Sequence, residues 1–309
     1  MNARVTKHDI LAADARIGGH VHVTPVMQML VPGLDEPLPV KLENTQLTGS
    51  FKVRGAFNTL LASDVPDGGV VAASGGNHGA AVAFAARALG HPAAIFVPEI
   101  AGPSKIALIR ETGADLTVMP GAYSDALAAA RDHEARTGAM QIHAYDAPMT
   151  VAGQGTLLRE WEAQGLDADT VLIAVGGGGL IAGAMAWNDG RRKIVAVEPE
   201  KAQTLANALT HGPGTETEVG GIAANALGAR AIGRICYDLA VETGVENVLV
   251  SDEAIAAAQR SLWQVARQWV EPAGATALAA LLSAAYRPEP EERVAVLICG
   301  ANPAPGPFD

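Results

Sequence analysis

Cysteine is scarce in this chain of 309 residues, where Cys236 and Cys299 are the only two and lie far apart. A disulfide framework needs more, so this usage indicates a reducing compartment, and we expect a cytoplasmic protein. The N-terminus lacks the apolar stretch of a signal peptide. The sequence also has no uninterrupted apolar run of about eighteen residues, so no membrane span is predicted.

Positively charged residues are also few, since 22 Lys and Arg face 33 Asp and Glu and give a formal net charge of -11. A nucleic-acid binder normally presents a basic face, and an anionic membrane would repel such a chain. The expected partner is therefore a small molecule. The 49% of apolar residues suffice for a sizeable interior, and the length suits one large domain or two lobes.

No Pro/Ser-rich linker and no internal repeat divides the sequence. Short apolar runs such as "GGVVAAS" (68–74) and "TVLIAV" (170–175) instead alternate with alanine-rich helical segments such as 77–90 and 252–269. This alternation predicts an α/β fold with parallel sheets covered by helices. Ligands of such sheets bind at the carboxyl ends of the strands, so the loops that follow the strands are the candidate sites.

The segment "VLIAVGGGGLIAG" (171–183) predicts a strand, four glycines and a helix. Glycines let the backbone approach an anion, and the free N–H groups of a helix start point at it, so we interpret the loop as a phosphate cradle rather than a plain tight turn. Gly177, Gly179 and Ala182 also fit a dinucleotide fingerprint, with Glu198 placed to hold a ribose. An NAD-dependent oxidoreductase therefore stays open as an alternative.

Two further motifs, "LTGSFKVRGA" and "ASGGNHGAA", precede the glycine loop. The three together, in this order, resemble the fold type II pyridoxal-phosphate enzymes, and within them the serine/threonine dehydratases and the related serine racemases. The resemblance runs from about residue 6 to 303 and includes "VAGQGT", "WVEPAGATALAALL" and "VLICGAN". It gives Lys52 a role, which the oxidoreductase interpretation does not.

The resemblance implies a homodimer of two-lobed subunits, similar to the tryptophan synthase β-chain. The larger, cofactor-binding domain would combine residues 1–65 and 147–309, and the smaller domain would be residues 66–146.

The resemblance also implies the site residues. Lys52 matches the lysine that holds pyridoxal phosphate as a Schiff base, and Cys299 matches the position that contacts the pyridine nitrogen. The implied cofactor-binding set is Phe51, Lys52, Asn77, Gly176, Gly177, Gly178, Gly179 and Cys299. The implied loop for the substrate carboxylate is Ser74, Gly75, Gly76, Asn77 and His78. The alternatives are an ordinary helix cap for Asn77, simple packing for the His78 imidazole and a core thiol for Cys299.

The chemistry of Lys52 depends on its charge. An amine attacks an aldehyde only when neutral, and a lysine with the usual pKa of about 10.4 is almost wholly protonated at neutral pH. The apolar neighbours of Lys52 predict a desolvated cleft that lowers this pKa. Cys299 is a weak donor and should leave the pyridine unprotonated, which suits elimination.

By this resemblance the reaction is a dehydration, in which Lys52 removes the Cα proton and a β-hydroxy amino acid such as threonine or serine becomes a 2-oxo acid and ammonia. A racemase needs a second acid/base, which related racemases supply as a serine where this chain has Gly75. A serine racemase-like isomerase, or a dehydratase of 3-hydroxyaspartate or phenylserine, are the alternatives.

A divalent cation is left open. Many relatives bind one through a glutamate, a backbone carbonyl and an aspartate, which by position are Glu198, Ala202 and Thr204. Thr204 is not the expected carboxylate. The stretches 143–148 and 220–229 also depart from the dehydratase pattern, and we expect both to line the substrate pocket.

Overall fold

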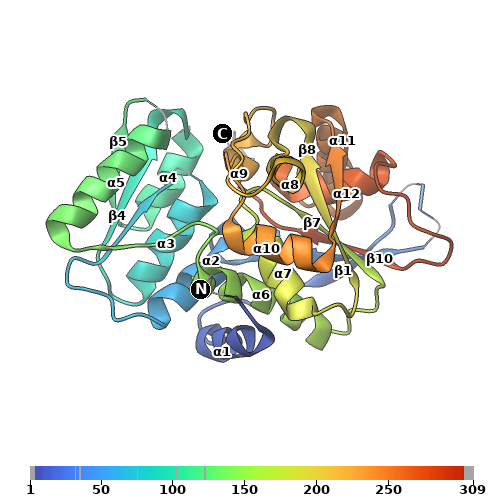
Figure 1. Cartoon of the computed structure of the whole chain (residues 1–309), viewed down its shortest axis with the longest axis horizontal. Coiled ribbons are helices and arrows are strands. Elements are labelled where there is room, and N and C mark those ends of the chain that lie inside the picture. The colour runs from blue at the N-terminus through green and yellow to red at the C-terminus, as the bar shows by residue number, and fades with distance from the viewer. Residues whose placement is uncertain are drawn as a thin grey trace.

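The structure, a computed structural model, describes residues 4–31, 33–34, 36–74, 76–101, 103–121 and 123–302. They form two separate β-sheets packed with helices (Figure 1). The predicted α/β class with helix-covered, largely parallel sheets is confirmed. No helix in the described part of the chain is long and apolar enough to cross a membrane.

The larger sheet has six strands in the order β1-β2-β10-β7-β8-β9. Only its edge strand β1 runs antiparallel, and the other pairings are parallel. Every residue of β7 and β10 is buried, as continuous apolar strands of a parallel sheet should be. In sequence order the strands are β1 (Val26–Met29), β2 (Leu38–Leu42), β7 (Thr170–Ala174), β8 (Lys193–Pro199), β9 (Glu246–Val250) and β10 (Val294–Ile298).

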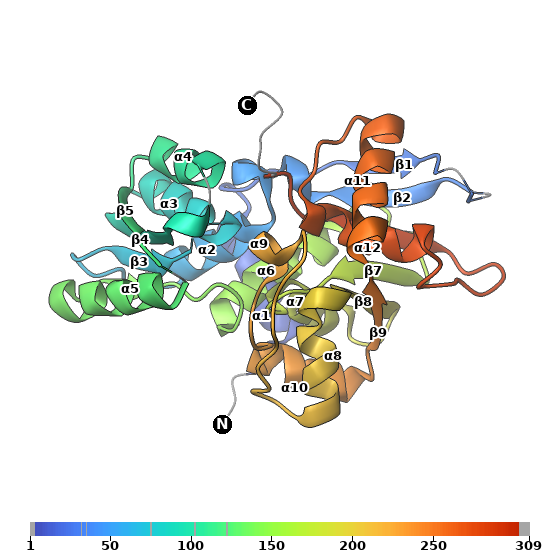
Figure 2. The ribbon, with the colours of Figure 1, turned by 90° about the horizontal axis from the view of Figure 1, so that it is seen from above.

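The smaller sheet has four parallel strands in the order β5-β4-β3-β6. Helices α3 and α4 lie on one face and α5 on the other, as both views show (Figures 1 and 2). The elements are β3 (Val70–Ala73), α3 (Asn77–Ala88), β4 (Ala93–Pro98), α4 (Pro103–Glu111), β5 (Asp115–Met119), α5 (Tyr123–Thr137) and β6 (Met140–Gln141).

The remaining helices surround the larger sheet or join the two sheets. They are α1 (Lys7–Ile17), α2 (Lys52–Leu61), α6 (Pro148–Ala163), α7 (Gly179–Asn188), α8 (Thr204–His211), α9 (Ala224–Leu227), α10 (Arg234–Thr243), α11 (Asp252–Ala266) and α12 (Pro272–Leu282). Short 3₁₀ turns are η1 (Glu43–Thr45), η2 (Leu47–Gly49), η3 (Glu99–Ala101) and η4 (Glu200–Ala202).

Helix α2 lies between the two sheets (Figures 1 and 2). It packs against α3 on one side and α6 on the other. Its Val53, Phe57 and Leu60 are buried in the same apolar core as Val70 of β3. The N-terminal end of α2, where Lys52 stands, is therefore held by side chains from both halves of the molecule.

Three predicted boundaries differ from the structure. The run "MQIHAY" (140–145) predicts a strand, but the strand ends at Gln141, and the chain turns because Nδ1 of His143 accepts the N–H groups of Tyr145 and Asp146. The expected helix at 252–269 ends at Ala266, where Arg267 takes a left-handed φ of 54°. The cap of α3 is Gly76 rather than Asn77, which is already the first helical residue.

Candidate active site

Lys52 is the first residue of α2, at the point where the loops of both sheets meet. Its Nζ donates to the carbonyl oxygen of Ala144 at 2.8 Å and lies 5.2 Å from the centroid of the Phe51 ring. The backbone N–H of Phe51 donates to the carbonyl oxygen of Cys299, just beyond β10. The Lys52 side chain is thus held at its amine by the loop after β6, and its backbone is held next to β10 through Phe51.

Burial lowers the pKa of Lys52 to about 8, against a weaker opposite effect of Cys299 and Glu271. At pH 7 such a pKa leaves roughly 10% of the amine neutral, compared with roughly 0.04% for a free lysine. The lowered pKa agrees with the desolvated surroundings expected from the sequence, and it enlarges the neutral, nucleophilic fraction of the amine.

The pKa of Lys52 predicts how quickly a cofactor aldehyde should attach to it. Because only the neutral amine attacks, the rate of loading the cofactor-free protein should rise about tenfold per pH unit below 8 and level off above it. Stopped-flow absorbance across pH 6 to 10, with neither component saturating, measures this. A profile that climbs to about pH 10, as for free lysine, would contradict the desolvated site.

A buried charge cluster anchors α2 two residues after Lys52. The Arg54 guanidinium donates to both carboxylate oxygens of Glu43, at 2.8 and 2.7 Å, and to Glu160 at 2.9 Å. Nζ of Lys41 donates to the other oxygen of Glu160 at 2.5 Å. Arg54, Glu43 and Lys41 are at most 1% exposed. This cluster was not predicted from the sequence, although the arginine stands inside the motif "FKVRGA".

Gly176 to Gly179 form the turn between β7 and α7, as predicted. Added Cβ atoms would lie 2.7 Å from backbone Leu227 at Gly176, 2.3 Å from the Tyr145 ring at Gly177 and 2.5 Å from Sγ of Cys236 at Gly178. Gly178 also has a φ of 87°. The chain's own packing therefore needs glycine at these positions.

The same turn fits a phosphate. The first N–H groups of α7 have no acceptor within the helix, and a glycine backbone lets an anion approach them. Tyr145 and Leu227, which flank the turn, belong to the two stretches 143–148 and 220–229. Both stretches therefore border the glycine turn, and Tyr145 adjoins Ala144, the partner of Lys52.

The loop after β3 carries the predicted substrate residues. The N–H of Gly76 donates to Oγ of Ser74 at 3.3 Å. His78 is buried, and its Nε2 is 2.9 Å from the carbonyl oxygen of Ile142. Burial lowers the pKa of His78 to about 3, so the imidazole is neutral and acts as a packed hydrogen-bonding group. Gly75 lies outside the described residues.

Asn77 and Cys299, two of the predicted cofactor-binding residues, both make hydrogen bonds in the structure. Asn77 donates to Glu271 and accepts from Asn302. The Cys299 thiol lies 3.4 Å from the carbonyl oxygen of Ala273, and burial raises its pKa, so it stays protonated. Glu271 and Asn302 were missed as site residues, although they stand in the quoted segments "WVEPAGA" and "CGAN".

Glu198 and its neighbours do not fit a divalent cation. The Glu198 carboxylate is buried and accepts the N–H groups of Leu205 and Ala206 and the side-chain amide of Asn247, at 2.7, 2.9 and 2.8 Å. Thr204 turns its hydroxyl to the carbonyl oxygen of Ala229. The Glu198 carboxylate is thus occupied by N–H donors, and in the described part of the chain no group of three or more His, Cys, Asp and Glu could hold a metal ion.

We therefore expect magnesium and EDTA to leave the melting temperature of the protein unchanged. Thr204→Asp should lower the melting temperature without magnesium, because it sets two carboxylates side by side, and magnesium should restore it. Thr204→Asn, of the same shape but uncharged, is the matched control. A melting temperature of the parent that rises with magnesium would contradict this interpretation.

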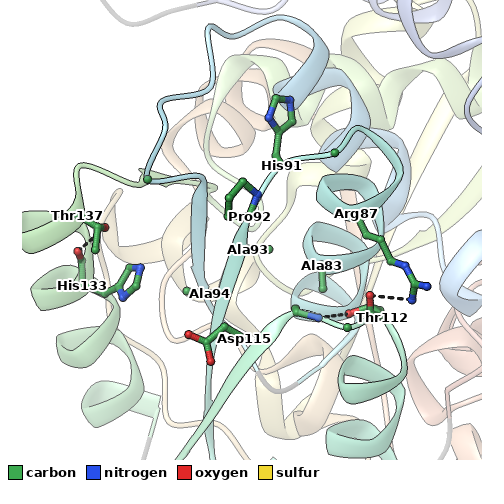
Figure 3. A pocket seen from close by; sticks show the side chains of 14 residues that line it. Ala83, Arg87, His91, Pro92, Ala93, Ala94, Thr112, Asp115, His133 and Thr137 are labelled. Atoms are coloured by element: carbon green, nitrogen blue, oxygen red, sulfur yellow. Dashed lines mark hydrogen bonds between the residues drawn. The ribbon is translucent and has the colours of Figure 1, made fainter.

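A cavity of about 790 Å³ lies at the opposite, amino ends of β3, β4 and β5. In Figure 3, Arg87 lies on one side of the cavity and donates a hydrogen bond to the carbonyl oxygen of Thr112, and His133 lies on the other side. Most of its lining residues are glycines, alanines and other small residues. Because ligands of parallel sheets bind at carboxyl ends, the surroundings of Lys52 are the candidate active site.

The comparisons with known proteins show the family. Residues 17–300 match the family described as pyridoxal-phosphate dependent enzyme. The chain belongs to this family. The predicted family and cofactor are thereby confirmed, and the nicotinamide alternative is wrong.

Three relatives illustrate the likeness. Phenylserine dehydratase of Ralstonia pickettii is 35% identical and aligns over 93% of this chain and 90% of its own. The crystal structure of a T.th. threonine deaminase has a TM-score of 0.90 and 34% identity, covering 98% of this chain and 100% of that one. Maize serine racemase has a TM-score of 0.87 and 30% identity, covering 97% and 94%. These two structures share the two-sheet fold along nearly the whole chain.

Proposed function

We propose that this pyridoxal-phosphate dependent enzyme is a dehydratase, an ammonia-lyase of a β-hydroxy amino acid such as threonine or serine. The product would be a 2-oxo acid, with ammonia released by hydrolysis of the unsaturated amine. The observation that carries the proposal is Lys52, a partly buried amine whose pKa is lowered to about 8, in a structure that also holds a glycine turn at a helix start. Two of the three relatives described above are named dehydratase or deaminase.

Each residue of the site has a place in this reaction. Pyridoxal phosphate, when bound, supplies an electron sink for the charge that develops at Cα. We assign Gly176–Gly179 and the first turn of α7 to its phosphate, and Lys52 to its aldehyde. Once the substrate amine has replaced Lys52 at the aldehyde, the freed neutral amine would remove the Cα proton, and the β-hydroxyl would take up a proton and leave as water. The loop Ser74–His78 would take the substrate carboxylate through its backbone N–H groups.

Cys299 would face the ring nitrogen of the cofactor. In the structure its thiol is within reach of the Ala273 carbonyl, the stronger acceptor of its proton. A protonated thiol already directed at a carbonyl leaves the ring nitrogen without a strong proton donor. This supports elimination, in which the leaving group departs as the Cα proton is lost, over a long-lived carbanion.

We further propose that the enzyme works as a homodimer in the cytoplasm and that residues 66–146 form its smaller domain. The scarcity of cysteine supports the compartment, and the four-stranded sheet built from residues 70–141 supports the domain. Helix α2 shares a core with that sheet, so the connection to the larger domain is tight.

A serine racemase-like isomerase is the second candidate, because maize serine racemase is similar along nearly the whole chain. Both are tested by incubating the holoenzyme with L-threonine, L-serine, 3-hydroxyaspartate and phenylserine. A keto-acid assay and chiral chromatography of the remaining amino acid follow the two reactions separately. We expect keto acid from at least one substrate with negligible D-isomer. Racemisation faster than elimination would reject the dehydratase and favour the isomerase.

A further inference from the structure

A chain of polar groups links η2 to the start of α12 beside Lys52. Nδ2 of Asn302 donates to the carbonyl oxygen of Thr48 and to Oδ1 of Asn77, each at 2.8 Å. Nδ2 of Asn77 donates in turn to Oε1 of Glu271. Asn77 and Glu271 are buried, 8% and 3% exposed. Glu271 is also close enough to act on the charge of Lys52.

The group at one end of this series of hydrogen bonds, the Thr48 carbonyl, determines which atom donates in each bond. The Thr48 carbonyl can only accept. Asn302 must therefore turn its amide nitrogen to Thr48, and its second N–H meets the oxygen of Asn77. Asn77 is then left with its NH₂ group toward Glu271. The orientation of the Asn77 amide, which is ambiguous for an isolated side chain, has one solution here.

The Glu271 side chain contacts Asn77 and does not cap its own helix. Glu271 is the N-cap residue of α12, where a carboxylate commonly accepts the first free N–H groups of its own helix. Its side chain makes no such cap bond. Gly300 supplies the space, since a Cβ at that position would lie 2.2 Å from Oε1 of Glu271. A missing cap and a glycine thus both serve the contact with Asn77.

We propose that Glu271 is a positioning residue that holds the Asn77 amide with its second N–H directed at the ring oxygen of the cofactor. The proposal rests on the placement of Asn77 against that ring under the proposed function. In the described part of the chain, the second N–H of Asn77 has no acceptor of its own. Asn302 completes the arrangement by occupying the Asn77 oxygen, which would otherwise repel an ionised ring oxygen.

In this arrangement Asn77 can offer the ring oxygen only a donor, because its own oxygen already accepts from Asn302. A donor stabilises the ionised form of the ring oxygen, the form with the delocalised visible absorption. Glu271 acts on the ring oxygen through Asn77, so the part of its effect that reaches the ring oxygen should depend on whether Asn77 is present.

The test is a double-mutant cycle on the holoenzyme with Asn77→Ala, Glu271→Leu and the double variant. The readouts are the dissociation constant for pyridoxal phosphate, by equilibrium dialysis, and the wavelength of the bound cofactor's visible band. Each single variant should weaken binding on the order of tenfold and shift the band. The double variant should lose no more than Asn77→Ala alone, because the two residues act as one unit.

Glu271→Gln keeps an acceptor for Asn77, so it should retain cofactor affinity within a few-fold of the parent. Glu216→Gln, in an exposed ion pair, is the matched surface control. If the effects of Asn77→Ala and Glu271→Leu simply add, or if Glu271→Leu leaves both readouts unchanged, the proposal is wrong.

Gly300→Ala provides a second route if Glu271→Leu does not fold. The added methyl should displace the carboxylate without removing its charge and reproduce the shifted band. An unshifted band in a folded Gly300→Ala protein would overturn the proposal. Both readouts concern the bound cofactor alone, so they stay informative whichever amino acid the enzyme takes. Failure of the keto-acid assay would leave this test standing.

Discussion

Lys52→Ala is expected to lower the turnover of the β-hydroxy amino acid by on the order of 10² to 10⁴-fold, because it removes the general base. It should also end covalent attachment of the cofactor. Borohydride treatment followed by peptide mapping should label Lys52 in the parent and no residue in the variant. The keto-acid assay gives the rate.

Lys201→Ala is the control for this experiment. Lys201 is largely exposed and pairs with Asp252 on the surface, so its loss should change neither labelling nor turnover. A Lys52→Ala protein that keeps activity within about tenfold of the parent, or a borohydride label on another residue, would refute the assignment of Lys52.

Arg54→Met is expected to lower the free energy of unfolding by about 3–5 kcal/mol, the usual cost of removing one partner from a buried ion pair. The buried Glu43 would lose the ion pair with Arg54, and the partly buried Glu160 would keep only its ion pair with Lys41. Urea unfolding at pH 7, followed by circular dichroism, measures the change. Since α2 begins two residues earlier, cofactor affinity should fall as well.

Arg230→Met is the matched control for this variant. Arg230 pairs with Glu216, both side chains being more than 70% exposed, and an exposed pair contributes about 0–1 kcal/mol. If the two variants lose similar amounts of unfolding free energy, burial does not increase the contribution of the Arg54 ion pairs to stability.

Much of the fold was predictable because it depends on local patterns. The runs that form β7 and β10 are apolar throughout, and the glycine turn and α7 follow β7 directly. The antiparallel edge strand β1 and helices α8 and α10 were not predicted. The strand at 140–145 was predicted too long, because the ring of His143 competes for backbone N–H groups in a way no periodicity reveals.

The candidate site divides in the same way. Lys52, Asn77 and the glycines stand in recognisable motifs, but Glu271 and Asn302 reach Asn77 from 194 and 225 residues away. The glycine turn was interpreted from its sequence as a phosphate cradle only. Its packing against Tyr145 and Cys236 adds a second reason for glycine that spacing along the chain cannot show.

The sequence by itself determined the family, the α/β class, the cofactor and the lysine that should carry it, because ordered motifs and apolar runs are properties of the chain. The tertiary structure alone decided the contacts of Lys52 with Ala144 and Phe51, the use of the Glu198 carboxylate as a hydrogen-bond acceptor and the orientation of the Asn77 amide. Each of these depends on desolvation and on which donors and acceptors meet, and both arise only when distant segments pack together.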